Sequence, residues 1–86
     1  MYELDDLNMD EAVLKQYSGE EEKITISKKI DNKKIVSVGA FAFSEHREIV
    51  EITLPETVVS IGAHAFYNCR NLASITLYDT VTDIGD

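Results

Sequence analysis

Cysteine, proline and tryptophan are scarce in this 86-residue sequence, which contains one cysteine, one proline and no tryptophan. A lone Cys69 cannot form an internal disulfide. It also cannot make a zinc site with the two histidines, His46 and His64, which lie in different sequence contexts. Cysteine usage fits a reducing compartment and equally a surface protein stabilised by other means, so it leaves the localisation open. We expect no metal site.

Basic residues are half as numerous as acidic ones, with eight Lys and Arg against 16 Asp and Glu, and the formal net charge is −8. Residues 23–86 are nearly neutral, so the excess acid lies in residues 1–22. That segment contains Lys15 as its one base and eight acids: Glu3, Asp5, Asp6, Asp10, Glu11, Glu20, Glu21 and Glu22. Nucleic acids and anionic membranes attract basic surfaces. We therefore expect no nucleic-acid partner.

Long apolar runs are missing as well, since no stretch approaches the roughly 20 residues that span a bilayer. The first residues, Met1–Asp6, are acidic and lack the basic start and apolar run of a signal peptide. We expect a soluble chain without membrane insertion and with no signal peptide in the sequence as given. The apolar fraction of 44% is ordinary for a folded protein. This length allows one domain with a small core.

Two stretches of the sequence, Val38–Ser60 and Ile61–Asp83, are copies of one another. At a fixed offset of 23 residues ten positions are identical: Gly39/Gly62, Ala40/Ala63, Ala42/Ala65, Phe43/Phe66, Arg47/Arg70, Ile52/Ile75, Thr53/Thr76, Leu54/Leu77, Thr57/Thr80 and Val58/Val81. A third copy begins at Ile84-Gly85. Repeats of this length indicate a solenoid, in which the same position of successive coils is stacked.

An inward position of a solenoid must stay apolar in every coil. We therefore predict two core layers, the first made of Val38, Phe43, Ile49, Ile52, Leu54 and Val58, and the second of Ile61, Phe66, Leu72, Ile75, Leu77 and Val81. The alternation at 52–54 and 75–77 predicts short strands with threonine facing solvent. Gly39 and Gly62 would lie at a corner, where glycine permits either positive φ or close backbone approach. The Ala-x-Ala-Phe stretches 40–43 and 63–66 predict one helical turn each.

The repeat resembles a known bacterial family. Residues 61–77 read Ile-Gly-Ala-His-Ala-Phe-Tyr-Asn-Cys-Arg-Asn-Leu-Ala-Ser-Ile-Thr-Leu. This is similar to the BspA-like leucine-rich repeat, whose unit runs Ile-Gly-x-x-Ala-Phe-x-x-Cys-x-x-Leu-x-x-Ile-x-Leu-Pro-x-x-Val. The resemblance implies an α/β-type solenoid that is mostly β, a short right-handed stack with short strands and single helical turns. The first copy departs at His46, which replaces the cysteine, and its polar run 44–47 predicts a looser or more exposed corner.

The resemblance also divides the chain. Residues 1–37 are similar to the family's N-terminal capping unit, a β-hairpin plus an incomplete first repeat, and residues 38–86 form two full coils and the start of a third. We expect a strand at Lys23–Ile26 and a hairpin-like return over 30–39 around the turn Asp31-Asn32. Alone, Asp10–Tyr17 would be read as a short helix capped by Asp10. The resemblance favours a strand paired with Tyr2–Leu4.

Candidate chemistry is sparse. Cys69 occupies an inward column, so a buried structural thiol is favoured over a nucleophile. His46 and His64 belong to different coils and different repeat positions, which argues against a metal or catalytic pair. No glycine-rich phosphate loop, carboxylate pair or triad signature is present. We therefore expect no enzyme, no catalytic residue and no cofactor.

Two surfaces are candidates for binding. A basic cluster of Lys28, Lys29, Lys33 and Lys34 brackets the 31–32 turn, and there a solvated hairpin is favoured over an anion site. The predicted partner-binding face consists of outward strand residues: Thr25, Glu51, Thr53, Ser74 and Thr76. The exposed face of a solenoid sheet is its usual binding surface, although small hydroxyl residues are also simply good strand formers.

The resemblance implies a protein-interaction module, part of a bacterial surface or secreted binding protein, with a protein partner. The alternative is a structural cap or spacer of a longer array without a ligand of its own. The stack has no C-terminal cap within the sequence, so we expect an open apolar end at Leu77–Ile84. Either the sequence is a fragment, or another surface covers this end, for example through self-association.

Overall fold

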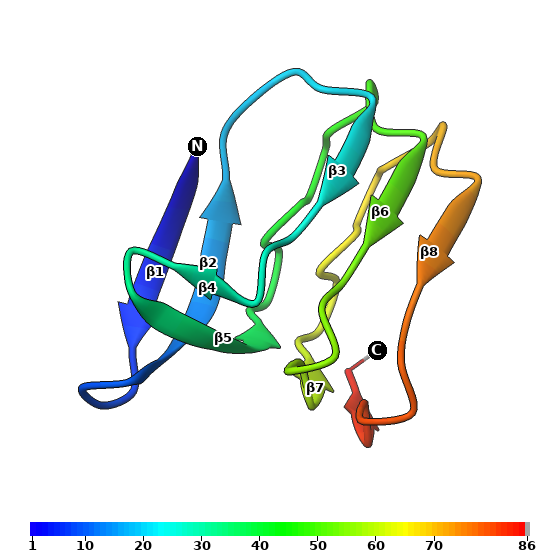
Figure 1. The fold of residues 1–86 in the computed structure, drawn as a ribbon. Helices are drawn as coiled ribbons and strands as arrows, with labels where there is room; N and C mark the ends of the chain where they lie inside the picture. Colours follow the sequence, from blue (N-terminus) through cyan, green and yellow to red (C-terminus); the bar gives the residue numbers. More distant parts are fainter. Residues whose placement is uncertain (86) are drawn as a thin grey trace.

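The computed structural model describes residues 1–85, which form nine strands and no helix. The strands are β1 (Tyr2–Asp6), β2 (Glu11–Tyr17), β3 (Lys23–Thr25), β4 (Lys29–Ile30), β5 (Lys33–Val38), β6 (Glu51–Thr53), β7 (Ser60–Ile61), β8 (Ser74–Thr76) and β9 (Asp83–Ile84). One sheet has the order β1-β2-β5-β7-β9, with β4 paired to β5, and the other has the order β3-β6-β8. The chain alternates between the two sheets and forms a mostly-β solenoid of about three turns (Figure 1).

The strand register confirms the 23-residue repeat. Val38 pairs with Ile61 and Ile61 with Ile84, while Ile52 pairs with Ile75, always in parallel. Lys23 pairs with Glu51, 28 positions later, so the first coil is five residues longer over this span. The β4–β5 hairpin lies within it.

The hairpin turn is the one that the sequence predicted. Asp31 and Asn32 have φ angles of 52° and 66°, and they join β4 to β5 in an antiparallel pair. A two-residue turn with positive φ at both positions matches the right-handed twist of the flanking strands. Asn and Asp tolerate this region of φ better than other residues with a side chain.

Residues 11–17 form a strand and not a helix, as the resemblance favoured. β2 is antiparallel to β1 and parallel to β5, with Leu14 opposite Val38. Ala12, Leu14 and Tyr17 of β2 are buried. The segment therefore extends the stack on its N-terminal side and supplies apolar side chains to the same core.

The core follows the predicted columns. All six residues of the first predicted layer are at most 1% exposed: Val38, Phe43, Ile49, Ile52, Leu54 and Val58. Aromatic rings form a continuous column through the coils, from Tyr2 to Tyr17, Phe43 and Phe66, with successive centroids 5.4, 5.5 and 5.6 Å apart. The second predicted layer is only partly enclosed.

The prediction of single helical turns at 40–43 and 63–66 is wrong. Phe41 and His64 have φ angles of 59° and 54°, which lie in the left-handed region and cannot belong to a right-handed helical turn. Between the two segments, the Phe41 N–H donates to the Ala63 carbonyl at 3.2 Å and the Phe43 N–H to the Ala65 carbonyl at 2.7 Å. Phe41 thus belongs to a stretch in which alternate N–H groups donate to carbonyl oxygens of the next coil. The right-handed winding of the stack stays a prediction.

Close approach, and not positive φ, explains the repeated glycine. No glycine among residues 1–85 has positive φ. A Cβ added to Gly62 would lie 2.5 Å from the Ala40 nitrogen, closer than real contacts allow. The Gly62 N–H donates to the Val38 carbonyl at 2.7 Å. The backbones of neighbouring coils therefore meet at this corner.

Candidate interaction surfaces

The five predicted binding residues lie together on the sheet formed by β3, β6 and β8. Thr25, Thr53 and Thr76 form one row across the sheet. Glu51 and Ser74 are neighbours in a second row. Between the rows, the isoleucines at 24 and 52 are buried, so the two rows occupy the opposite, outer side of the pleat. The structure brings these side chains together, and their use in binding stays a prediction.

The sequence analysis missed the residue that begins the second row. Lys23 pairs with Glu51, so this row reads lysine, glutamate, serine across the sheet. Lys23 precedes Thr25 by two positions, as Glu51 precedes Thr53, and that spacing would have found it. The outer face thus carries one charge of each sign beside a row of hydroxyl groups.

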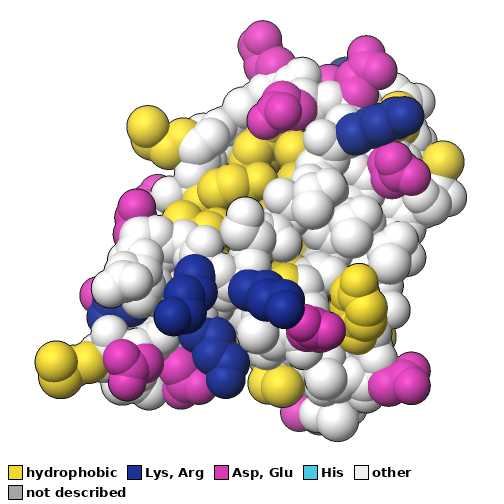
Figure 2. Space-filling view, viewed as in Figure 1, with side chains coloured by type: hydrophobic (Ala, Val, Ile, Leu, Met, Phe, Trp, Pro, Cys, Tyr) yellow, Lys and Arg dark blue, Asp and Glu magenta, His cyan; other side chains and the backbone are white. Residues whose placement is uncertain are grey.

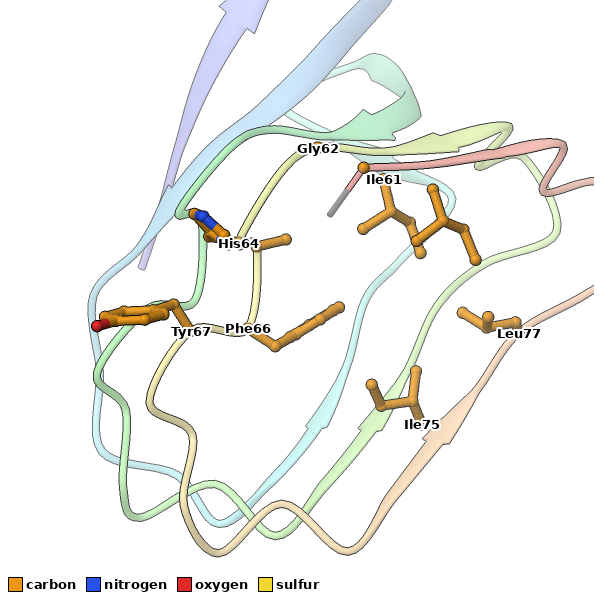
Figure 3. A pocket seen from close by; sticks show the side chains of 10 residues that line it. Ile61, Gly62, His64, Phe66, Tyr67, Ile75 and Leu77 are labelled. Carbon is orange, nitrogen blue, oxygen red and sulfur yellow. The ribbon is translucent and has the colours of Figure 1, made fainter.

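The second surface is the apolar end of the stack. Ile75 is 38% exposed and Leu77 39%, whereas their counterparts one coil earlier, Ile52 and Leu54, are at most 1% exposed. The side chains of Ile61, Phe66, Ile75 and Leu77 point toward one another (Figure 3). With Ile84, His64 and Tyr67 they line a hollow of about 230 Å³. The last described coil exposes the layer that the preceding coil buries.

An exposed aromatic cluster beside this end was also missed. Phe41, His64 and Tyr67 have ring centroids 5.3 to 6.2 Å apart, and all three side chains are exposed. Phe41 and His64 share one repeat position, so stacking of coils alone predicts their contact. Tyr67 follows His64 by three positions, in a turn where the Tyr67 N–H donates to the His64 carbonyl oxygen at 3.1 Å.

His46 is held more tightly than expected. Its side chain is 18% exposed, Nδ1 lies 2.8 Å from Glu48 Oε2, and Nε2 lies 2.9 Å from the Tyr17 carbonyl oxygen. The greater exposure predicted for this corner is not found: two of the four residues 44–47 are exposed, as are two of their four counterparts 67–70. The reason is that the imidazole fills the space against the ring of Tyr17, with centroids 4.9 Å apart.

Cys69 has the surroundings of a structural thiol. It is half-buried, and its Sγ donates to the Phe43 carbonyl oxygen at 2.9 Å. Burial raises the pKa of the Cys69 thiol and the charge of Glu48 acts in the same direction, whereas a hydrogen bond from the His46 backbone opposes them. A raised pKa leaves little thiolate at neutral pH, which disfavours nucleophilic chemistry.

Two of the four lysines in the basic cluster, Lys28 and Lys33, have recorded partners. Lys28 forms an ion pair with Glu56, whose hydrogen bond and charge raise the pKa of Lys28. Lys33 donates to the Asn8 carbonyl oxygen at 2.7 Å and lies 3.6 Å from Asp6. Figure 2 shows basic side chains gathered near this hairpin with acidic side chains among them. This intermixing favours a solvated hairpin over an anion site.

Within residues 1–85, no three His, Cys, Asp or Glu side chains are grouped so that they could hold a metal ion. The same part of the chain contains no helix with the length and hydropathy needed to cross a membrane. His46 and His64 are not brought together, since they contact different partners. The absence of enzymatic activity stays a prediction.

Comparison with known proteins places these features in context. The family model described as "BspA type Leucine rich repeat region (6 copies)" matches residues 16–86. The crystal structure of the leucine-rich repeat protein of T. pallidum (TpLRR) is similar over 98% of this chain, with a TM-score of 0.87 and 32% sequence identity. A leucine-rich cell surface protein from Faecalibacterium prausnitzii A2-165 is similar over 98% of this chain, with a TM-score of 0.84 and 30% identity.

The comparison with curated proteins found no match. This chain spans 39% of the T. pallidum structure and 24% of the F. prausnitzii structure. Both relatives therefore contain much chain that has no counterpart here.

Proposed function

Since the chain belongs to the BspA-type leucine-rich repeat family, as the match over residues 16–86 shows, we propose that it is an interaction module that binds a protein partner. The binding surface is the outer face of β3, β6 and β8, whose side chains are Thr25, Glu51, Thr53, Ser74 and Thr76, with Lys23 added. The observation that carries the proposal is the alignment of these polar side chains in two unbroken rows over three coils. Such a row offers regularly spaced hydrogen-bonding groups to an extended partner surface.

The proposal extends to location and to the parts of the chain. A bacterial surface or secreted protein is supported by the F. prausnitzii relative, whose name describes a cell surface protein. Residues 1–37 act as the N-terminal cap and residues 38–86 as repeating coils. In support of a capping role, the edge strand β1 carries Glu3, Asp5 and Asp6. Charged edge strands discourage pairing with other chains.

We further propose that the apolar end of the stack is an association surface. The exposed side chains of Ile75, Leu77 and Ile84 leave about 230 Å³ of apolar hollow open. Apolar surface of this kind is stabilised by burial, and two copies of the chain can bury it against each other.

A structural spacer without a ligand is the second candidate. It is supported by side chains that bond the backbone of the neighbouring coil. Thr57 Oγ1 donates to the Ile35 carbonyl oxygen at 2.6 Å, Thr80 Oγ1 to the Val58 carbonyl oxygen at 3.0 Å, and Asn71 Nδ2 to the Arg47 carbonyl oxygen at 2.8 Å. These groups stabilise the stack, and none of them lies in the two rows of the outer face.

The test measures binding of the chain to a fixed panel of purified extracellular-matrix glycoproteins by biolayer interferometry. We expect Thr53→Val with Thr76→Val to weaken binding at least about fivefold, because each removed hydroxyl costs a hydrogen bond worth about 0.5–1.5 kcal/mol. Thr82→Val is the matched control, an exposed threonine outside the sheet. Unchanged affinity in the double variant would show that the binding site is not on this face. No binding to any panel member would favour the spacer.

A further inference from the structure

The outer edge of β8 presents a defined set of backbone groups. Among residues 1–85 its sheet has the order β3-β6-β8, so β8 is an edge strand. On the side toward β6, the Thr76 carbonyl oxygen accepts from the Leu54 N–H at 3.1 Å. The Ser74 N–H donates to the Val50 carbonyl oxygen on that same side at 3.4 Å. Successive residues of a ladder direct their backbone groups to opposite neighbours. The N–H and C=O of Ile75, between these two residues, therefore point away from β6.

The preceding coil identifies the groups that flank Ile75 on this edge. Before the strand, the Val50 carbonyl oxygen accepts from the Ala73 N–H of the next coil at 2.9 Å. After the strand, the Leu54 N–H donates to the next coil, as described for Thr76. The 23-residue offset makes Ala73 the counterpart of Val50 and Leu77 the counterpart of Leu54. The outer edge of β8 therefore offers the Ala73 carbonyl oxygen, both groups of Ile75 and the Leu77 N–H.

This set of groups is complementary to itself when a second β8 runs antiparallel to the first. With Ile75 on a two-fold axis, the Ile75 N–H of each copy faces the Ile75 carbonyl oxygen of the other. Two residues along the strand, the Leu77 N–H of each copy faces the Ala73 carbonyl oxygen of the other. These are the reciprocal pairs of an antiparallel ladder. The arrangement thus gives each outward group of this edge a partner.

The apolar side chains beneath this edge suit the same arrangement. Ile75 and Leu77 are 38% and 39% exposed, and with Phe66 they point into the apolar hollow of about 230 Å³ (Figure 3). A two-fold axis through Ile75 places the hollow of one copy over that of the other. Both apolar layers are then removed from water, which stabilises the contact.

Charges at the ends of β8 favour the antiparallel orientation. Arg70 precedes this strand and Asp79 follows it, and both side chains are exposed. Antiparallel pairing about Ile75 brings Arg70 of each copy toward Asp79 of the other. Opposite charges that meet across a contact help to determine its register.

The shape of the two ends of the stack selects this contact over a head-to-tail one. At the C-terminal end the two sheets finish together, at β8 and β9. At the N-terminal end, β2 and β1 continue one sheet beyond β5, while the other sheet finishes at β3 within residues 1–85 (Figure 1). Two additional strands project by about 9–10 Å at the usual strand spacing. A flat end fits another flat end, which produces a closed two-fold contact.

We propose that two copies of the chain associate through antiparallel pairing of their β8 strands about Ile75. This pairing rests on the association surface proposed above and specifies its geometry. It joins the two three-stranded sheets into one continuous sheet. Thr76 of one copy then lies opposite Ser74 of the other, so the hydroxyl groups of the outer face continue across the contact. The proposed partner-binding face is thereby doubled and two-fold symmetric.

The test introduces cysteines on the outer face in a Cys69→Ser background, which lacks the native thiol. Ser74 and Thr76 of opposite copies form a non-hydrogen-bonded pair with Cα atoms about 4.5 Å apart, within the reach of a disulfide. Two copies of Ser74 lie on a diagonal, at about 7–8 Å, where a disulfide does not form without backbone movement. Under mild oxidation we expect an equal mixture of the Ser74→Cys and Thr76→Cys proteins to give several times more covalent dimer than either protein alone.

The matched control mixes the Ser74→Cys protein with a Thr53→Cys protein. Thr53 lies on the same face but one strand further from the contact, so this mixture should not cross-link above the level of the single variants. Light scattering of the reduced, unaltered chain separates the pairing from the surface on which it rests. A dimer whose Ser74→Cys and Thr76→Cys mixture gives no additional covalent product would overturn β8 pairing and leave the association surface standing. A chain that stays monomeric at high protein concentration would overturn both.

Discussion

The ring of Phe43 lies flat against the ring of Phe66, with centroids 5.6 Å apart and planes inclined by 15°. The two residues occupy the same position of successive coils, 23 positions apart. On its other side Phe43 packs against Tyr17, with centroids 5.5 Å apart. Phe43 is therefore covered from both sides and fully buried, whereas Phe66 is covered from one side and half-buried.

This asymmetry predicts unequal costs for the same substitution. We expect Phe43→Ala to lower the free energy of unfolding by about 3–5 kcal/mol, the usual range for a fully buried phenylalanine. Phe66→Ala should cost less than half as much, because part of its surface is already in contact with water. Urea denaturation followed by circular dichroism measures both values. Equal losses would contradict the one-sided burial of the last layer.

The corner glycines, Gly39 and Gly62, allow a second comparison of the same substitution at equivalent positions of two coils. A Cβ at Gly62 would lie 2.5 Å from the Ala40 nitrogen, while a Cβ at Gly39 would lie 3.2 Å from the Leu14 carbonyl oxygen. We expect Gly62→Ala to destabilise the fold by about 2–3 kcal/mol, because the backbones of two coils must separate.

Gly39→Ala is the matched control, with an expected loss below about 1 kcal/mol, since a shift of a few tenths of an ångström relieves its contact. Chemical denaturation of the two variants measures the difference. If Gly39→Ala were the more damaging, the close approach would not be the reason for the repeated glycine.

The open end of the stack predicts self-association. Ile75 and Leu77 are about 40% exposed in the last described coil, with Ile84 beside them at 64%. We expect the 86-residue chain to associate at high protein concentration, as measured by light scattering after size-exclusion chromatography. Leu77→Lys should shift it to a monomer, because a charge at the centre of the contact is costly to bury. Lys15→Leu on β2, which lies toward the opposite edge of the sheet from β9, should not. A stable monomer of the unaltered chain would contradict the expectation.

The sequence predicted most of the architecture because the repeat carries it. A fixed offset determines which residues stack, so the strand columns and the first core layer followed from spacing alone. The turn at Asp31-Asn32 followed from residue type. The outer face was predicted from alternation along the strands, apart from Lys23, which the same alternation places two positions before Thr25.

Other features depend on contacts that spacing does not encode. His46 is enclosed because its ring meets a backbone carbonyl of Tyr17, and no side-chain pattern marks a backbone acceptor. The left-handed turns at Phe41 and His64 belong to two stretches joined by hydrogen bonds between coils, from the N–H groups of Phe41 and Phe43 to the carbonyl oxygens of Ala63 and Ala65, and the helical preference of the alanines does not anticipate this pairing. The aromatic cluster with Tyr67 was missed for the same reason.

The left-handed conformation of Phe41 is itself testable. This residue has a φ of 59° and a side chain 49% exposed, so it contributes little burial while occupying a region that L-residues with bulky side chains rarely adopt. Asparagine tolerates this region, and β-branched residues tolerate it least. We expect Phe41→Asn to change the free energy of unfolding by less than about 0.5 kcal/mol, because relief of strain offsets the lost ring contacts with His64 and Tyr67. Phe41→Val should cost about 1–3 kcal/mol. Differential scanning calorimetry of the pair isolates the backbone effect, and a valine variant as stable as the asparagine variant would show that the turn adopts ordinary negative φ.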